Sequence, residues 1–322
     1  MLPETDYSTP WAVHGRIQLA TVSAPDVDAM VDSYAKGLRF HVFTQGRVTP
    51  ELAALWGASA MAGKRWVLMG PDNPHSTSIR IVEGDPLPEG YAPLRTFGWG
   101  ALEMAVLNVM EVNDAVAAAG FRIVGVPADR QFSGPVKPMQ AAGLGGEMFF
   151  LTEIRGDAKH YFYPRPLSFV DQLFIAILST PDRRAAQAFY ENALGFPFVA
   201  DYEMAYTSLN KCMGLPVDTP QQFTMVKSGK RPAVQIDQMP PGAAKRPTAP
   251  AKLPPGIAMI TFLVDRLEDV KAPLLSPPQE ISFAPYAGSR SACVRGAAGE
   301  LIELIEIGAC GDGDEEEDEI EI

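Results

Sequence analysis

The stretch IQLATVSAPDVDAMVDSYAKGLRF, residues 17–40, recurs in the second half of the chain as LFIAILSTPDRRAAQAFYENALGF, residues 173–196. The alignment places Pro25 on Pro181, and the two copies lie 156 residues apart. In each copy a strand-like apolar run leads to a proline, after which apolar residues recur at helical spacing. Each half of the chain therefore begins with the same strand and helix.

The repeat continues to the ends of both halves. GALEMAVLNV, residues 100–109, matches GIAMITFLVD, residues 256–265, again 156 residues apart. GGEMFFLTEI, residues 145–154, matches AGELIELIEI, residues 298–307, after a loop deletion of three residues. Because self-similarity at one period is the signature of a duplicated architecture, the chain is predicted to contain two homologous domains.

Each half also divides into two similar units. A strand-like run followed by an amphipathic helical stretch begins at Arg16, Ala101, Gln172 and Ile257. With the strand-like runs that follow, we predict an α+β chain of four βαβββ modules, and a proline-rich extended loop at residues 240–256. The predicted boundaries are an N-terminal segment at 1–13, a first domain at 14–155 with modules 14–84 and 98–155, a linker at 156–168, a second domain at 169–308 with modules 169–239 and 256–308, and an acidic disordered tail at 309–322.

The charge of the chain is unevenly distributed. The net charge is −12 over 322 residues, and eight of the negative charges lie between Asp312 and Glu321, which leaves −4 for the rest. Hydrophobic residues make up 47% of the chain and charged residues 20%, as in ordinary folded proteins. Since phosphate binding needs clustered Lys and Arg, a nucleic acid partner is not expected.

Cysteine content and hydropathy bear on the compartment. Cys212, Cys293 and Cys310 are odd in number and widely spaced, which predicts neither a disulfide framework nor a cysteine zinc site. The N-terminus lacks a signal-peptide pattern, and no apolar run approaches the about 18 residues that a membrane span needs. We expect a cytoplasmic protein with a small-molecule substrate and no membrane partner, and a homodimer stays open.

Two short motifs now indicate a family. AFYENALGF, residues 188–196, resembles the helix end of glyoxalase-like modules, and AAGELIELIE, residues 297–306, resembles their closing strand. With four modules in the right order, the chain resembles the vicinal oxygen chelate superfamily of glyoxalases, bleomycin-resistance proteins and extradiol dioxygenases. The resemblance implies two tandem domains with curved mixed sheets, each holding a site on its concave face. Metal-dependent members place one ligand on the first and last strand of each module.

These four positions are filled differently in the two halves. The second domain offers Glu303 as a carboxylate ligand, with Gln172 or Phe174, Gln235 and Met259 at the other positions. The first domain offers Arg16 or Gln18, Arg80, Glu103 and Phe150. An arginine would repel an ion, and none of the four histidines falls on such a position. We therefore expect no resident cofactor; the alternative is a divalent Fe, Mn, Zn or Ni ion held by Glu303 and Gln172.

The same positions supply the candidate site residues. Glu103 and Glu303 are the candidate catalytic acid/base residues, and Arg80, Gln18, Gln172 and Gln235 are the candidate substrate-binding residues. Arg80 is expected to pair with Glu103 across the module interface, as a structural ion pair or as an anchor for a substrate carboxylate or phenolate. The alternative for each Glu or Gln is a solvated position on the outer face of a strand.

Three functions follow from the resemblance. The first is an enzyme that acts on a small aromatic or carbonyl-bearing molecule by isomerase or lyase acid–base chemistry, with no metal. A metal-dependent extradiol-type dioxygenase is its catalytic alternative. The second is a drug-resistance-like protein that binds a small molecule without converting it. In the third, one domain has become a structural partner and only the other retains a site.

Overall fold

The computed structural model of the chain describes residues 14–73, 76–89, 91–128, 136–155, 163–229 and 231–307. Within these residues the strands form two eight-stranded mixed sheets, accompanied by short helices. The predicted α+β class and the four modules are confirmed. The predicted N-terminal segment, the acidic tail and most of the linker lie outside the described residues, as do His75 and His160.

The first two modules follow the predicted order of elements. The first module consists of β1 (Ile17–Ala24), α1 (Val27–Gly37), β2 (His41–Arg47), β3 (Arg65–Gly70) and β4 (Ser78–Glu83), with α2 (Pro50–Leu55) and the 3-10 helix η1 (Ser59–Met61) inserted between β2 and β3. The second consists of β5 (Gly98–Val106), α3 (Val109–Ala118), β6 (Arg122–Gly125), β7 (Val136–Ala142) and β8 (Met148–Ile154), preceded by η2 (Pro93–Arg95).

The last two modules repeat this order with one change. The third consists of β9 (Val170–Thr180), α4 (Arg183–Leu194), β10 (Phe198–Ala205), α5 (Thr207–Met213), β11 (Pro220–Ser228) and β12 (Arg231–Gln238). The fourth consists of β13 (Gly256–Val264), η4 (Leu267–Asp269), β14 (Gln279–Glu280), β15 (Arg290–Arg295) and β16 (Leu301–Glu306). The amphipathic helix expected after Ile257 is therefore only a 3-10 turn, because Pro273 prevents a helix from continuing.

Side-chain caps start the longer helices. Asp26 accepts a hydrogen bond from the Ala29 amide at the start of α1, and Asp182 accepts one from Ala185 at the start of α4. These are the residues directly after the prolines of the repeat, so the same local signal is used twice. None of the helices among the described residues is long and apolar enough to cross a membrane.

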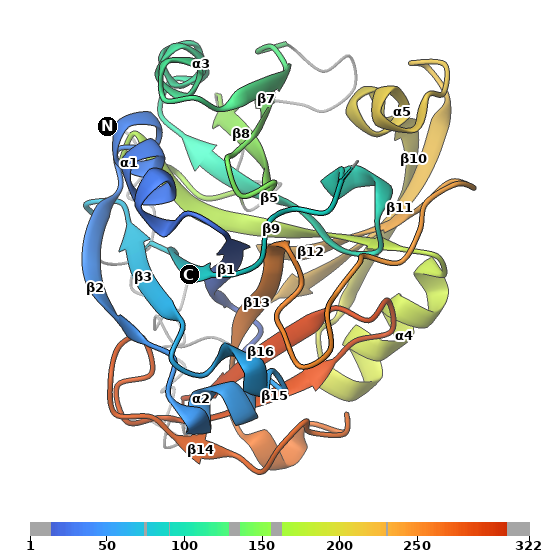
Figure 1. Cartoon of the computed structure of the whole chain (residues 1–322). Helices are drawn as coiled ribbons and strands as arrows, with labels where there is room; N and C mark the ends of the chain where they lie inside the picture. Colours follow the sequence, from blue (N-terminus) through green and yellow to red (C-terminus); the bar gives the residue numbers. More distant parts are fainter. Residues whose placement is uncertain are drawn as a thin grey trace, which may run out of the picture.

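Sheet pairing crosses the two halves of the chain (Figure 1). The first sheet has the order β14-β15-β16-β13-β1-β4-β3-β2, so it joins the first and fourth modules through the antiparallel pair β1–β13. The second has the order β10-β11-β12-β9-β5-β8-β7-β6 and joins the second and third modules through β5–β9. The ranges 14–155 and 169–308 stay a proposal for the duplicated halves, while each sheet takes one module from each.

Apolar clusters define two faces on each sheet. One large cluster includes Val22, Tyr34, Phe149 and Tyr190, and so lies on the faces that α1, α3 and α4 cover. We call the opposite faces the inner faces. The inner face of the first sheet carries an apolar cluster that includes Trp56, Met259 and Tyr286. The inner face of the second sheet carries a cluster that includes Phe150, Phe174, Ile177, Met225 and Met239.

Candidate functional site

Four polar residues face one another across the first sheet. Thr21 on β1 stands in register with Arg80 on β4, and Thr261 on β13 stands in register with Glu303 on β16. Because strand residues alternate between faces and Ala20 and Val22 belong to the helix-covered cluster, Thr21 points to the inner face. The pairs β1–β13, β1–β4 and β13–β16 bring all four residues to the middle of that face.

The Glu303 carboxylate accepts four hydrogen bonds. Its Oε2 accepts from Arg80 Nη2 at 2.9 Å and from Thr261 Oγ1 at 2.6 Å. Its Oε1 accepts from Trp56 Nε1 at 2.7 Å and from Tyr286 Oη at 2.8 Å. The Glu303 side chain is fully buried, with 0% exposure. Both carboxylate oxygens are therefore occupied by groups of the chain itself.

All three nitrogens of the Arg80 guanidinium also donate hydrogen bonds within the chain. Its Nε and Nη2 donate to Thr21 Oγ1 at 3.1 and 2.8 Å, and its Nη1 donates to Tyr286 Oη. The Trp56 ring covers it, with its centroid 4.6 Å from the guanidinium carbon. Burial alone lowers the pKa of Arg80, but the Glu303 charge and Tyr286 raise it, so its pKa lies above its usual value. Arg80 therefore stays positively charged.

The strand ladders of the second sheet identify the corresponding positions. Gln235 on β12 pairs with Ile177 on β9, and this pair corresponds to Arg80 and Thr21 in the first sheet. Phe150 on β8 pairs with Glu103 on β5, and this pair corresponds to Glu303 and Thr261. The four positions thus hold Ile177, Gln235, Glu103 and Phe150.

The ladders also correct one alignment of the repeat. Gly98 pairs with Ser179, and Gly256 pairs with Ser23, so Gly98, rather than Gly100, corresponds to Gly256. Both glycines start their strands with positive φ values, of 102° and 72°. In this part of the chain the period is 158 residues, and Glu103 corresponds to Thr261 rather than to Met259.

Polar groups on the inner face of the second sheet lie among apolar side chains. Glu103 Oε1 accepts from Thr152 Oγ1 at 2.7 Å, and Gln235 Nε2 donates to Asp237 Oδ1 at 2.8 Å. Glu103 is buried to 8% exposure beside a face that carries Phe150 and Ile175. This inner face is mostly apolar, with a carboxylate and an amide at two of its four central positions.

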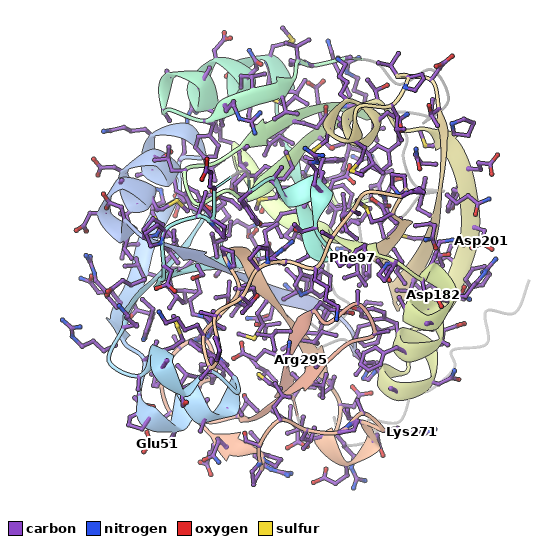
Figure 2. The ribbon with its side chains drawn as sticks, turned by 45° about the vertical axis from the view of Figure 1, so that its right-hand side comes forward. Glu51, Phe97, Asp182, Asp201, Lys271 and Arg295 are labelled. Atoms are coloured by element: carbon purple, nitrogen blue, oxygen red, sulfur yellow. The ribbon has the colours of Figure 1, made fainter. Side chains whose placement is uncertain are left out.

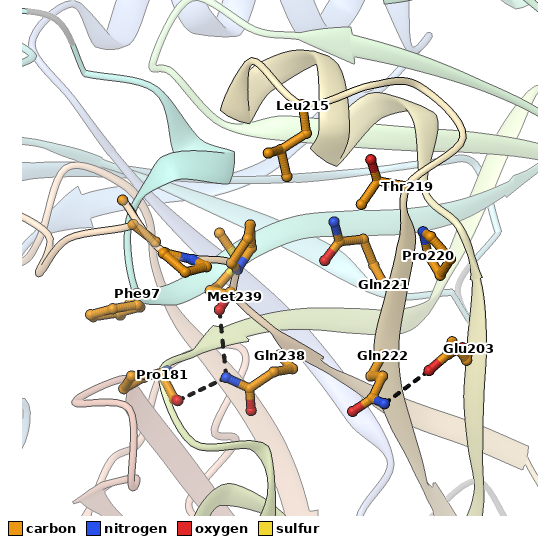
Figure 3. Close-up of a pocket in the computed structure, with 14 residues that line it drawn as sticks. Phe97, Pro181, Glu203, Leu215, Thr219, Pro220, Gln221, Gln222, Gln238 and Met239 are labelled. Carbon is orange, nitrogen blue, oxygen red and sulfur yellow. Dashed lines mark hydrogen bonds between the residues drawn. The ribbon is translucent and has the colours of Figure 1, made fainter.

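A cleft of about 730 Å³ opens beside this inner face, at the ends of β11 and β12 (Figure 3). Gln222 donates to Glu203 at its rim at 2.9 Å, and Gln238 donates to the Pro181 carbonyl at 2.8 Å. Phe97 and Met239 border it on the apolar side, and both contact the inner cluster of the second sheet. Figure 2 shows Phe97 near the middle of the molecule, whereas Glu51 of α2 lies at its edge.

The charged side chain that lines the cleft is negative. Among the described residues that line it, Glu203 carries a charge, three are glutamines, and none is Lys or Arg. Pro181, Pro220, Pro240 and Pro241 also line it, and their restricted backbones give the cleft stiff walls.

Comparison with known proteins gives a result at the level of structure. No family model matches the sequence, and no curated protein matches it. Glyoxalase I from Zea mays superposes with a TM-score of 0.58 at 15% identity, covering 90% of this chain and 92% of that one. A putative dioxygenase from Bacillus subtilis superposes with a TM-score of 0.61 at 13% identity, covering 91% and 86%. The chain has the glyoxalase fold. The fold expected from the sequence is thereby confirmed.

The glyoxalase fold raises the question of a divalent ion, and the donor sets do not fit one. In the first sheet the Arg80 guanidinium occupies one of the four positions, and both oxygens of its counter-ion, Glu303, already accept hydrogen bonds. In the second sheet two of the four positions, Ile177 and Phe150, are apolar. Within the described part of the chain, no group of three or more His, Cys, Asp or Glu side chains could hold a metal ion.

Two expected pairings of site residues are wrong. Arg80 binds Glu303 and not Glu103, because the fourth module, and not the second, completes its sheet. Glu303 and Gln172, the proposed metal ligands, lie in different sheets. Gln172 instead accepts from Arg231 Nη1 at 3.5 Å, and Gln18 is a half-buried residue of β1.

Sequence reasoning missed several of the residues that contact Arg80 and Glu303. Thr21 and Thr261 become visible only when β1 is paired with β13, because each is a neutral residue in an apolar strand. Tyr286 comes from the segment between β14 and β15, and Trp56 is the residue that ends α2. Residues outside regular strands and helices carry no periodic signal, so the sequence did not place either of them beside Arg80 and Glu303.

Proposed function

We propose that this glyoxalase-fold chain binds a small organic molecule in the cleft beside the second sheet, without a divalent ion. The contrast between the two inner faces carries the proposal. The inner face of the first sheet is closed by the Arg80–Glu303 pair. The second is flanked by a cleft whose volume falls within the roughly 300–1,000 Å³ of small-molecule sites.

The lining favours an uncharged or positively charged ligand. A carboxylate at Glu203 attracts a cation, and the absence of Lys and Arg among the described lining residues disfavours an anion. The amides of Gln221, Gln222 and Gln238 offer both donors and acceptors. Phe97 and Met239 provide the apolar surface on which a flat part of the ligand packs.

Catalysis by Glu103 is the second candidate, and its buried carboxylate beside Thr152 favours it. A carboxylate in an apolar setting is a suitable general base for isomerase or lyase chemistry. This enzyme activity is a proposal that depends on the first, because a substrate has to bind beside the second sheet before Glu103 can act on it.

Binding of three isosteric probes tests the proposal. The probes are an aromatic molecule with a quaternary ammonium group, its neutral isostere and its carboxylate isostere, and calorimetry gives their Kd values. We expect the cation and the neutral probe to bind more tightly than the anion. Glu203→Lys should weaken cation binding about tenfold at low ionic strength, because an attraction becomes a repulsion.

The matched control is Glu51→Lys, which makes the same charge change on α2 of the first module. This variant should leave all three Kd values unchanged. Equal affinity for the cation and the anion, or a Glu203→Lys variant that binds the cation as well as the parent does, would show that the ligand lies elsewhere.

A further inference from the structure

We propose that the first sheet contains a cation-binding site whose cation is supplied by the chain itself, as the guanidinium of Arg80. The inference is independent of the small-molecule site, because it concerns the other sheet. Three oxygen atoms surround the guanidinium: Thr21 Oγ1, Glu303 Oε2 and Tyr286 Oη. They come from β1, from β16 and from the segment between β14 and β15.

The oxygen atoms form one connected shell. Thr261 on β13 donates to the same Glu303 oxygen that Arg80 contacts, so all four central strands of the sheet contribute to the site. A carboxylate pairs with a cation, and hydroxyl and phenol oxygens accept hydrogen bonds from a guanidinium. The arrangement is therefore that of a small cation site, in which a tethered side chain fills the centre.

Arg80 and Glu303 are so deeply buried that loss of the guanidinium would destabilise the folded protein. Arg80 is 1% exposed and Glu303 0% exposed, and the Trp56 ring closes one side. Removing the guanidinium alone would leave a buried carboxylate without a counter-ion, which is strongly destabilising. It would also leave a cavity of matching shape, because the surrounding β-sheet cannot collapse into it.

These features predict that a soluble cation can replace the side chain. In Arg80→Ala, guanidinium ion at low millimolar concentration should enter the cavity, pair with Glu303 and raise Tm by several degrees relative to the same concentration of sodium chloride. The parent protein should show no such rise, because its site is full. Arg80→Ala combined with Glu303→Gln should show none either, because the counter-charge is gone.

A pair of larger substitutions keeps the test decisive if Arg80→Ala does not fold. Arg80→Lys retains a positive charge, whereas Arg80→Met fills a similar volume without charge. Thermal unfolding should show a much higher Tm for Arg80→Lys than for Arg80→Met. Equal Tm values for the two variants, or a guanidinium effect on Arg80→Ala that persists in its Glu303→Gln combination, would overturn the inference.

Discussion

The two candidate catalytic glutamates differ in the groups that surround their carboxylates. Glu303 accepts from Trp56, Tyr286, Thr261 and Arg80, so no oxygen is left for a substrate. The Glu103 carboxylate accepts a hydrogen bond from Thr152 on a face that is mostly apolar. We therefore assign Glu303 a structural role and keep Glu103 as the candidate acid/base residue.

This difference makes a prediction for Glu103→Gln. If the chain is an enzyme, turnover should fall by a factor of about 100 or more, since general acid–base catalysis contributes that much, while ligand affinity changes little. Thr152→Val should reduce turnover less, because it only removes the hydrogen bond that orients the carboxylate. Steady-state kinetics beside calorimetry would measure both, and full turnover in Glu103→Gln would remove this residue from the mechanism.

Two helices are joined to neighbouring modules by the same buried contact. Tyr34 of α1 donates to Glu147 Oε1 at 2.8 Å, and Tyr190 of α4 donates to Glu300 Oε1 at 3.1 Å. Each glutamate lies in the turn before a closing strand, and each folds back over a glycine, Gly143 or Gly296, where any Cβ would overlap the carboxylate. The repeat therefore preserves this contact as well as the strands.

These glutamates predict how stability depends on pH. Burial raises the pKa of Glu147 and of Glu300 from 4.5 to about 7. The folded state then holds protons that the unfolded state releases, so the free energy of unfolding decreases as pH rises from about 4.5 to about 7 and levels off above it. Chemical denaturation should show a more stable protein at pH 5 than at pH 8.

The control for this pH effect is substitution of both carboxyl groups. Glu147→Gln with Glu300→Gln should remove most of the slope between pH 5 and pH 8, because glutamine does not titrate. Glu51→Gln, at an exposed position of α2, should preserve the slope. An unchanged slope in the double variant would show that other groups set the pH dependence.

At the scale of the whole molecule, the sequence predicts the modules but not how they pair. The strands and helices of each module depend on local signals, such as the apolar runs and the caps at Asp26 and Asp182. Pairing of β1 with β13 joins the two ends of the chain, and a repeat period carries no information about that choice. The Arg80–Glu303 contact was missed for this reason, whereas the fold was not.

Pairing across the halves also explains why two copies of one module architecture have different inner faces. Each sheet combines an odd and an even module, so a change at one position alters only one of the two inner faces. Thr21, Arg80, Thr261 and Glu303 close the first face. At the same positions the second sheet has Ile177, Gln235, Glu103 and Phe150 and is flanked by the cleft.

The stoichiometry of ligand binding tests the central claim most directly, which is that one inner face is closed and the other serves a ligand. Calorimetric titration with the tightest of the three isosteric probes should give one site per chain. Arg80→Lys should leave its Kd unchanged, and Glu203→Lys should weaken it if that probe is the cation. Two equivalent sites per chain, or binding that is lost in Arg80→Lys, would contradict the account.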